Sequence, residues 1–271
     1  MKNLSLLIII VIFSVSCNKT VDTIATKQPL APEICVVKLD PVQLAAANMK
    51  RPTKTPKSST TSEPPPTETI TPTSDASYGV MLLDFNGQSI SSPVWNNGQT
   101  FTCAPSGFDA TQIDHIINEV KVDYAKYRII VTTDEQLYLQ ASATKRMRVV
   151  ITPTSGWYGG VSGVSYTGSL TWGDNTPCFV FIDRLAYDPH LVSEITSHEL
   201  GHSVGLGHQS SYSATCGFLT AYNTGDGTNA PLMGNSMYAT NGGSWWVGPT
   251  PNGCSTVQDD NKILTAKLLL R

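Results

Sequence analysis

The sequence predicts a mixed α+β fold for residues 76–271, and two observations predict it. Several short runs rich in Val and Ile are bounded by turn residues, a pattern typical of strands. Other segments carry helix-capping signals and, in one case, clear helical periodicity. The order strand, helix, strands, helix, loop and helix is typical of helices packed on a sheet. With 40% hydrophobic residues, the chain can fill the core of such a fold.

Five segments are predicted as strands: residues 80–85, 128–133, 147–152, 163–170 and 178–183. The first is an apolar run closed by the turn dipeptide Asn86-Gly87. The last has the continuous apolar pattern of a strand that is buried on both faces. Residues 163–170 alternate small and larger side chains, and this Gly- and Ser-rich segment is either a strand or a loop.

The first predicted helix covers residues 109–127. Asp109 and Gln112 have the spacing of a capping box, in which each side chain bonds the backbone of the other residue. Five apolar side chains fall on one face of this helix: Ile113, Ile116, Ile117, Val120 and Tyr124.

Two later helices are predicted from their first residues. One begins at Asp188 and Pro189, because proline fits the first helical turn, where its missing N–H costs nothing. We expect Ser255 and Gln258 to cap a final helix that runs through Leu270.

The composition argues against two classes of protein. Lys and Arg total 18 against 21 Asp and Glu, a net charge of -3, whereas nucleic-acid binding calls for a basic patch. We therefore expect no nucleic-acid partner. No apolar run reaches the roughly 18 residues of a membrane-spanning helix, which argues against a polytopic membrane protein. Six cysteines are too few for a disulfide-built scaffold.

Residues 1–16 are predicted to be a signal peptide. Lys2 supplies the positive charge, residues 4–13 supply the apolar stretch, and Cys17 follows directly. Residues 14–19 resemble the processing site of a bacterial lipoprotein, of the loose form common in Bacteroidetes. The resemblance implies that Cys17 is lipidated and anchors the exported chain to the envelope, at the outer membrane. The alternative is an ordinary signal peptide in which Cys17 is incidental.

Residues 17–75 are predicted to contain no domain. Residues 51–75 are rich in Pro, Thr and Ser and almost free of large apolar side chains, so we interpret them as a semi-extended linker. The short apolar patch at residues 34–39, which contains Cys35, belongs either to a pro-segment or to the same stalk. The domain that carries the chemistry then occupies residues 76–271.

The decisive motif has the form H-E-x-x-H-x-x-G-x-x-H and runs from His198 to His208. His198 and His202 are four residues apart, so on a helix they share one face and can bind one ion. Gly205 can end the helix with a sharp turn that returns His208 as a third ligand. Three imidazoles leave one position open for water, as in a catalytic zinc site. Glu199 is the candidate general base for that water.

The motif resembles that of the metzincin metallopeptidases. Residues 230–234 also resemble the Met-turn of that family, which places Met233 beneath the zinc; the alternative is that Met233 is ordinary core. Five further blocks resemble bacterial reprolysin-like members: residues 83–87, 131–134, 152–155, 163–169 and 258–260. The resemblance implies a twisted mixed sheet with an active-site helix, a Met-turn and a C-terminal helix.

The sequence departs from the metzincin patterns at two positions. Gln209 follows the third histidine, where reprolysin-like members usually carry Asp and many matrixins carry Ser. Asn235 stands where astacins place a zinc-binding tyrosine. The subfamily therefore stays open. Tyr238 either donates an O–H to an oxyanion or is a structural tyrosine.

The predicted function is that of a zinc-dependent endopeptidase with a protein or peptide substrate. Glu199 takes a proton from the attacking water and passes it to the leaving amine, while Zn²⁺ polarises the scissile carbonyl. By resemblance, the substrate adds as a strand to an edge strand at Gly163, Val164, Ser165 and Tyr166. Two alternatives remain: a catalytically idle surface binding or adhesion module, and a zinc hydrolase of cell-wall peptides.

Cysteine parity suggests two further features. If Cys17 is lipidated, five cysteines remain in an exported chain, which favours disulfides and leaves one unpaired. The four cysteines of the catalytic domain could form two bridges in three possible pairings, one of which joins Cys216 to Cys254 and Cys103 to Cys178. Cys35 would then be free to act as a latch, with its thiolate in the open zinc position.

Two weaker signals lie near the motif. Residues 223–229 are rich in oxygen ligands and Gly, which suggests either a Ca²⁺ loop or a plain flexible loop. Trp157, Tyr158, Trp245 and Trp246 line the substrate cleft or belong to the core.

Overall fold

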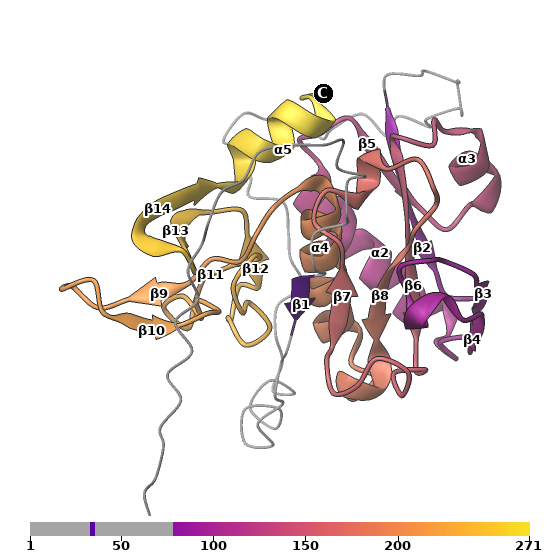
Figure 1. Cartoon of the computed structure of the whole chain (residues 1–271), viewed down its shortest axis with the longest axis horizontal. Helices are drawn as coiled ribbons and strands as arrows, with labels where there is room; N and C mark the ends of the chain where they lie inside the picture. The colour runs from indigo at the N-terminus through magenta and orange to yellow at the C-terminus, as the bar shows by residue number, and fades with distance from the viewer. Residues whose placement is uncertain (1–32, 36–77) are drawn as a thin grey trace, which may run out of the picture.

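The computed structural model describes residues 33–35 and 78–271 (Figure 1). The predicted signal peptide, Cys17 and the linker lie outside the described residues. Within the described part, no helix is both long and apolar enough to cross a membrane.

A six-stranded mixed sheet forms the centre of the domain. Its order is β1 (Glu33–Cys35), β7 (Gly163–Ser165), β8 (Cys178–Phe181), β6 (Arg146–Thr152), β2 (Gly79–Asp84) and β5 (Ile129–Thr132). The last four strands pair in parallel, whereas β7 is antiparallel to β8 and β1 is antiparallel to β7. The predicted α+β class with a mixed sheet is therefore confirmed.

Two long helices, α2 (Ala110–Tyr124) and α4 (Pro189–Val204), pack against each other and carry the main core. The capping box of Asp109 and Gln112 is present in full, as predicted. Asp188 caps α4 by accepting bonds from His190 N and Leu191 N, and Pro189 lies in its first turn. Every residue of α4 from Leu191 to Val204 is buried, because the helix runs through the interior of the molecule.

The two faces of the sheet belong to different apolar clusters. Along β8, Cys178 and Val180 join the cluster that contains α2 and α4, whereas Phe179 and Phe181 join a second cluster around Trp95. This alternation is the period of two that a strand imposes on its side chains. The chain between β2 and α2 contains the hairpin β3 (Gln88–Ile90) and β4 (Phe101–Cys103), which carries part of the second cluster.

The smaller elements complete the domain. The short helix α3 (Glu135–Gln140) contacts β2 and β6, and three 3-10 helices cover Asn96–Gly98, Ser169–Thr171 and Ile182–Arg184. After α4 come short pairs, drawn in orange to yellow in Figure 1: β9 (Ser211–Tyr212) with β10 (Phe218–Thr220), β11 (Ala230–Pro231) with β12 (Gly243–Ser244), and β13 (Val247–Thr250) with β14 (Gly253–Asp259). The chain ends in α5 (Asp260–Leu268).

Two predicted elements have wrong boundaries. The strand expected over residues 163–170 ends at Ser165, because the chain then turns into the 3-10 segment. The final helix does not begin at Ser255 and Gln258, because both residues lie in β14, where Gln258 is paired with Gly248 of β13. Its cap is Asp259, whose side chain accepts a bond from Lys262 N at 3.0 Å, and the helix stops at Leu268.

One of the two predicted disulfides is present. Cys216 is bonded to Cys254, with Cα atoms 5.6 Å apart. The predicted pair Cys103–Cys178 is wrong, because both are free, buried cysteines that belong to the clusters on opposite faces of the sheet.

Candidate metal centre

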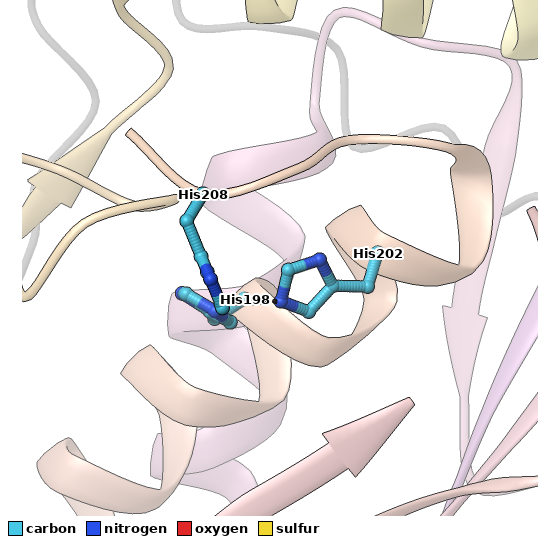
Figure 2. A group of neighbouring side chains, drawn as sticks. All are labelled: His198, His202 and His208. Atoms are coloured by element: carbon cyan, nitrogen blue, oxygen red, sulfur yellow. Dashed lines mark hydrogen bonds between the residues drawn. The ribbon is translucent and has the colours of Figure 1, made fainter. Parts of the chain in front are cut away.

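The helix α4 and the turn that follows it bring three histidines together (Figure 2). His198 and His202 are one turn apart on α4, with ring centroids 4.6 Å apart. Gly205 ends the helix with φ 125°, a left-handed conformation that glycine adopts readily. The chain then reverses, so that the His208 ring lies 4.7 Å from that of His202 and 5.3 Å from that of His198.

Backbone carbonyls fix two of the three rings. His198 Nδ1 donates to Leu232 O at 2.6 Å, and His202 Nδ1 donates to Leu206 O at 2.8 Å. Each bond leaves the Nε2 lone pair of its ring as the metal ligand, which is the usual arrangement behind metal-bound imidazoles. The Nε2 atoms of His202 and His208 are 3.1 Å apart. Ligands about 2.0 Å from one tetrahedral zinc would be roughly 3.3 Å apart, so the donor set fits zinc.

Burial keeps the imidazoles neutral. His202 is fully buried, and His198 and His208 are nearly so. Loss of hydration lowers the pKa of His198 to about 4 and that of His208 to about 3. Neutral imidazole is the form that binds metal, so the three rings are able to act as ligands at neutral pH.

Glu199 lies between α4 and the strand β7. Its carboxylate is fully buried, and a Cβ built on Gly163 would come within 2.5 Å of its Oε1. Because Gly163 has no side chain, there is space for the Glu199 carboxylate beside it. Burial, together with the charges of Tyr166 and Glu199, raises the pKa of Tyr158 to about 12.

The segment predicted as a Met-turn packs against the helix of the triad. Met233 is fully buried, and a Cβ on Gly201 of α4 would lie 2.7 Å from its Sδ. Its carbonyl accepts a bond from Gln209 N at 2.7 Å, next to His208. The preceding residue is Leu232, whose carbonyl orients His198. This one turn therefore contacts both the helix and the returning loop of the site.

A buried polar network, which was not predicted from the sequence, holds the loop that carries His208. Gln258 bonds Gly207 twice, at 2.8 Å to its N–H and 2.8 Å to its carbonyl. Asp260 accepts from the side-chain amides of Gln258 and Gln209, at 2.8 and 2.9 Å. Burial raises the pKa of Asp260 to about 6, against the lowering effect of hydrogen bonds from Trp246, Gln258 and Gln209. In the sequence, Gln209 stands out only because it differs from the residue that metzincins usually carry after the third histidine.

A second missed residue is Glu194, one turn before His198. Its carboxylate is buried and accepts bonds from Ser236 Oγ and from Gly243 N. Ser236 follows Met233 closely in the chain, so Glu194 joins the helix α4, which carries His198 and His202, to the segment after the predicted Met-turn. A glutamate inside an otherwise buried helix was the signal for it in the sequence.

The remaining candidates are placed as follows. Gly163, Val164 and Ser165 form β7, and Tyr166 follows its end. Cys35 is the last residue of β1 and is paired in register with Gly163. Tyr238 is partly buried and packs against the main core cluster.

The loop at residues 223–229 closes on itself. Asp226 is its one carboxylate and accepts bonds from Thr228 N and Asn229 N at 2.8 and 2.7 Å. Gly225 N bonds the Asn223 side chain at 2.9 Å. These bonds are those of a compact turn, and a Ca²⁺ role for the loop stays a prediction.

The aromatic residues fall into two groups. Trp157 and Tyr158 belong to the cluster around Trp95, and with Tyr166 they line a pocket beside β7. Trp245 packs on the main core and donates to Asp123 O at 2.8 Å, while Trp246 donates to Ser244 Oγ. The first group is therefore packed in a core cluster and also borders a pocket, while its role in a substrate cleft stays a prediction.

No model of a known protein family matches the chain, and no curated protein matches it. The mixed sheet and the buried histidine triad are compatible with a metzincin, and the triad is a candidate site for a metal ion.

Proposed function

We propose that the protein is a zinc-dependent endopeptidase of the metzincin type. One observation carries the proposal: three buried imidazoles converge, with Nδ1 of His198 and of His202 bonded to backbone carbonyls, and a buried glutamate follows the first of them in the chain. A site built only to hold zinc has no need of that glutamate. The Met-turn segment packed against α4 supports the same assignment.

His198, His202 and His208 would hold the ion. When bound, zinc supplies Lewis acidity, which polarises a carbonyl and lowers the pKa of water. Glu199 accepts a proton from the attacking water while the water oxygen bonds to the scissile carbonyl carbon. Glu199 then delivers that proton to the leaving amine as the C–N bond breaks, so the protein itself is unchanged. Burial of Glu199 against Gly163 keeps its carboxylate in one position for both transfers.

The substrate would bind as a strand along β7. The pairing of β1 with β7 supports this proposal, because it shows that β7 accepts an additional antiparallel strand. Backbone bonds along β7 would give affinity, and the pocket beside Tyr158 and Tyr166 would receive a side chain. While β1 occupies β7, residues 33–35 would exclude substrate, and Cys35 would lie at the level of Glu199 through its pairing with Gly163.

The proposed function is tested by a digest of a mixed peptide library read by mass spectrometry. We expect cleavage by the chain freed of residues 18–75, loss of cleavage with a chelator and recovery with Zn²⁺. Zinc binding without any cleavage would favour the binding or adhesion module. Cleavage limited to cell-wall peptides would favour the cell-wall hydrolase.

We further propose that lipidated Cys17 anchors the exported chain to the outer membrane of a bacterial envelope. Several acyl chains anchor a protein stably, whereas one chain binds only marginally. Cys17→Ser should therefore release the protein from the membrane fraction or stall its processing. Wild-type size and membrane content for this variant would contradict the anchor.

A further inference from the structure

All five histidines of the chain fall into two clusters. Three of them form the triad described above. The other two, His115 and His190, meet at Glu119, where the middle of α2 lies beside the first turn of α4. The candidate ligand atoms of this second cluster lie within 4.8 Å of one another, as those of the triad do.

The spacing of the second cluster is that of metal ligands. His115 Nε2 is 3.5 Å from Glu119 Oε1, and His190 Nδ1 is 3.0 Å from Glu119 Oε2. Both values lie near the roughly 3.3 Å expected between ligands of one tetrahedral zinc. His115 and Glu119 are four residues apart on α2, so they share one helix face, as His198 and His202 do on α4.

Glu119 is a buried carboxylate that lies between the two imidazoles. Its side chain is 2% exposed, and Ser193 Oγ donates to its Oε2. Its Oε1 has no hydrogen bond within the described part of the chain. Burial raises the pKa of Glu119, but hydrogen bonds and charge from His190, with the bond from Ser193, outweigh burial and lower it. An ionised carboxylate buried this deeply is costly unless positive charge compensates it, and a metal ion or a protonated imidazole can supply that charge.

The cluster is also accessible to an ion. The His115 side chain is 33% exposed and that of His190 is 13% exposed, so the cluster opens to solvent on the His115 side. Water can complete the coordination from that side. Two imidazoles and one carboxylate are a donor set that suits Zn²⁺ among the common divalent ions.

We propose that His115, Glu119 and His190 bind a second Zn²⁺ ion that ties α2 to α4. The ion would fix the first turn of the helix that carries His198 and His202. His190 Nε2 also lies 4.0 Å from Glu194 Oε1, and Glu194 holds Ser236 and Gly243. The second site thus lies next to the contact that joins α4 to the segment after the Met-turn. The proposal does not depend on peptidase activity.

The experiment compares the wild type with His115→Ala, a partly exposed position whose loss disturbs the fold little. The exposed Asn118→Ala on the same helix is the matched control. Each protein is stripped of metal, reloaded at buffered free Zn²⁺ and analysed for zinc per chain by mass spectrometry. Thermal unfolding is followed across the same zinc concentrations.

We expect wild type and Asn118→Ala to bind about one zinc more per chain than His115→Ala. Their Tm should keep rising with zinc after the tighter site is filled, because a ligand bound only by the native state stabilises it. This rise should be absent in His115→Ala. Equal zinc content and equal Tm dependence in wild type and His115→Ala would overturn the proposal.

Discussion

Gly163 and Glu199 show how a single hydrogen atom in place of a side chain can shape the site. A methyl group at Gly163 would meet Glu199 Oε1 at 2.5 Å and Ile195 Cγ2 at 2.8 Å. Both neighbours are on α4, inside a packed core that cannot move away at low cost. The role of Gly163 could not be predicted from the sequence, where it was only one of several small residues along a strand.

Gly163→Ala should therefore displace the carboxylate of Glu199 without touching the zinc ligands. We expect kcat to fall by about 10- to 100-fold, since misplacing a catalytic group by an ångström can cost about 100-fold. Zinc content should stay at the wild-type value. Gly160→Ala is the matched control, because a Cβ there meets nothing within 4 Å. Equal rates for both variants would show that Gly163 does not position Glu199.

Asp260 acts at the same scale but through two glutamines. It holds Gln209, which follows His208, and Gln258, which holds Gly207. In Asp260→Ala these amides lose a buried acceptor, and the loop that presents His208 should loosen. Partners of this kind typically contribute 10- to 100-fold in metal affinity. A zinc competition titration should show a loss of that size, whereas the exposed Lys262→Ala should not differ from wild type.

At the scale of elements, the sequence predicts interactions between residues that are close together in the chain, but not those between residues that are far apart. The start of α4 was predicted because Asp188 and Pro189 act on the next few residues. The start of α5 was misplaced because Gln258 looks like a helix cap in sequence, whereas it bonds Gly207, 51 residues away. The bond between Gln209 and Asp260 also spans 51 residues, and neither residue carries a local sign of it.

The pairing of β1 with β7 gives a prediction about elements. Ile34 is paired with Val164 in the middle of β1, and proline there would disrupt the pairing because it lacks an N–H and restricts the backbone. If β1 excludes substrate, unprocessed Ile34→Pro should cleave peptides faster than the unprocessed wild type. Unprocessed Cys35→Ser is assayed beside it without reductant. Faster cleavage by Cys35→Ser would indicate a thiolate latch, whereas faster cleavage by Ile34→Pro alone would indicate that β1 blocks the substrate position on β7. Wild-type rates for both variants would contradict both kinds of latency.

At the scale of the whole molecule, the triad lies where two unlike parts of the domain meet. In Figure 1 strands β7, β8, β6 and β2 of the sheet lie on one side of α4, and the short strand pairs of the later chain lie on the other. The first part was predictable, because its strands and helices repeat apolar patterns over many residues. The second part was not, because its strands are two to seven residues long and rich in Gly, Pro and Ser. The Cys216–Cys254 bond joins two of these hairpin segments.

The proposed chemistry requires that metal binding and turnover depend on different residues. His202 is a ligand, so His202→Ala should lose zinc together with peptide hydrolysis. Glu199 moves protons, so Glu199→Ala should fold, keep the zinc of the triad and cleave about 100- to 10,000-fold more slowly.

The most direct measurement is therefore zinc content and peptide hydrolysis on wild type, Glu199→Ala and His202→Ala, each freed of residues 18–75. We predict that Glu199→Ala retains zinc but loses hydrolysis. We predict that His202→Ala loses both the zinc at the triad and hydrolysis. Hydrolysis at the wild-type rate by Glu199→Ala, or by His202→Ala without zinc at the triad, would contradict the proposed mechanism.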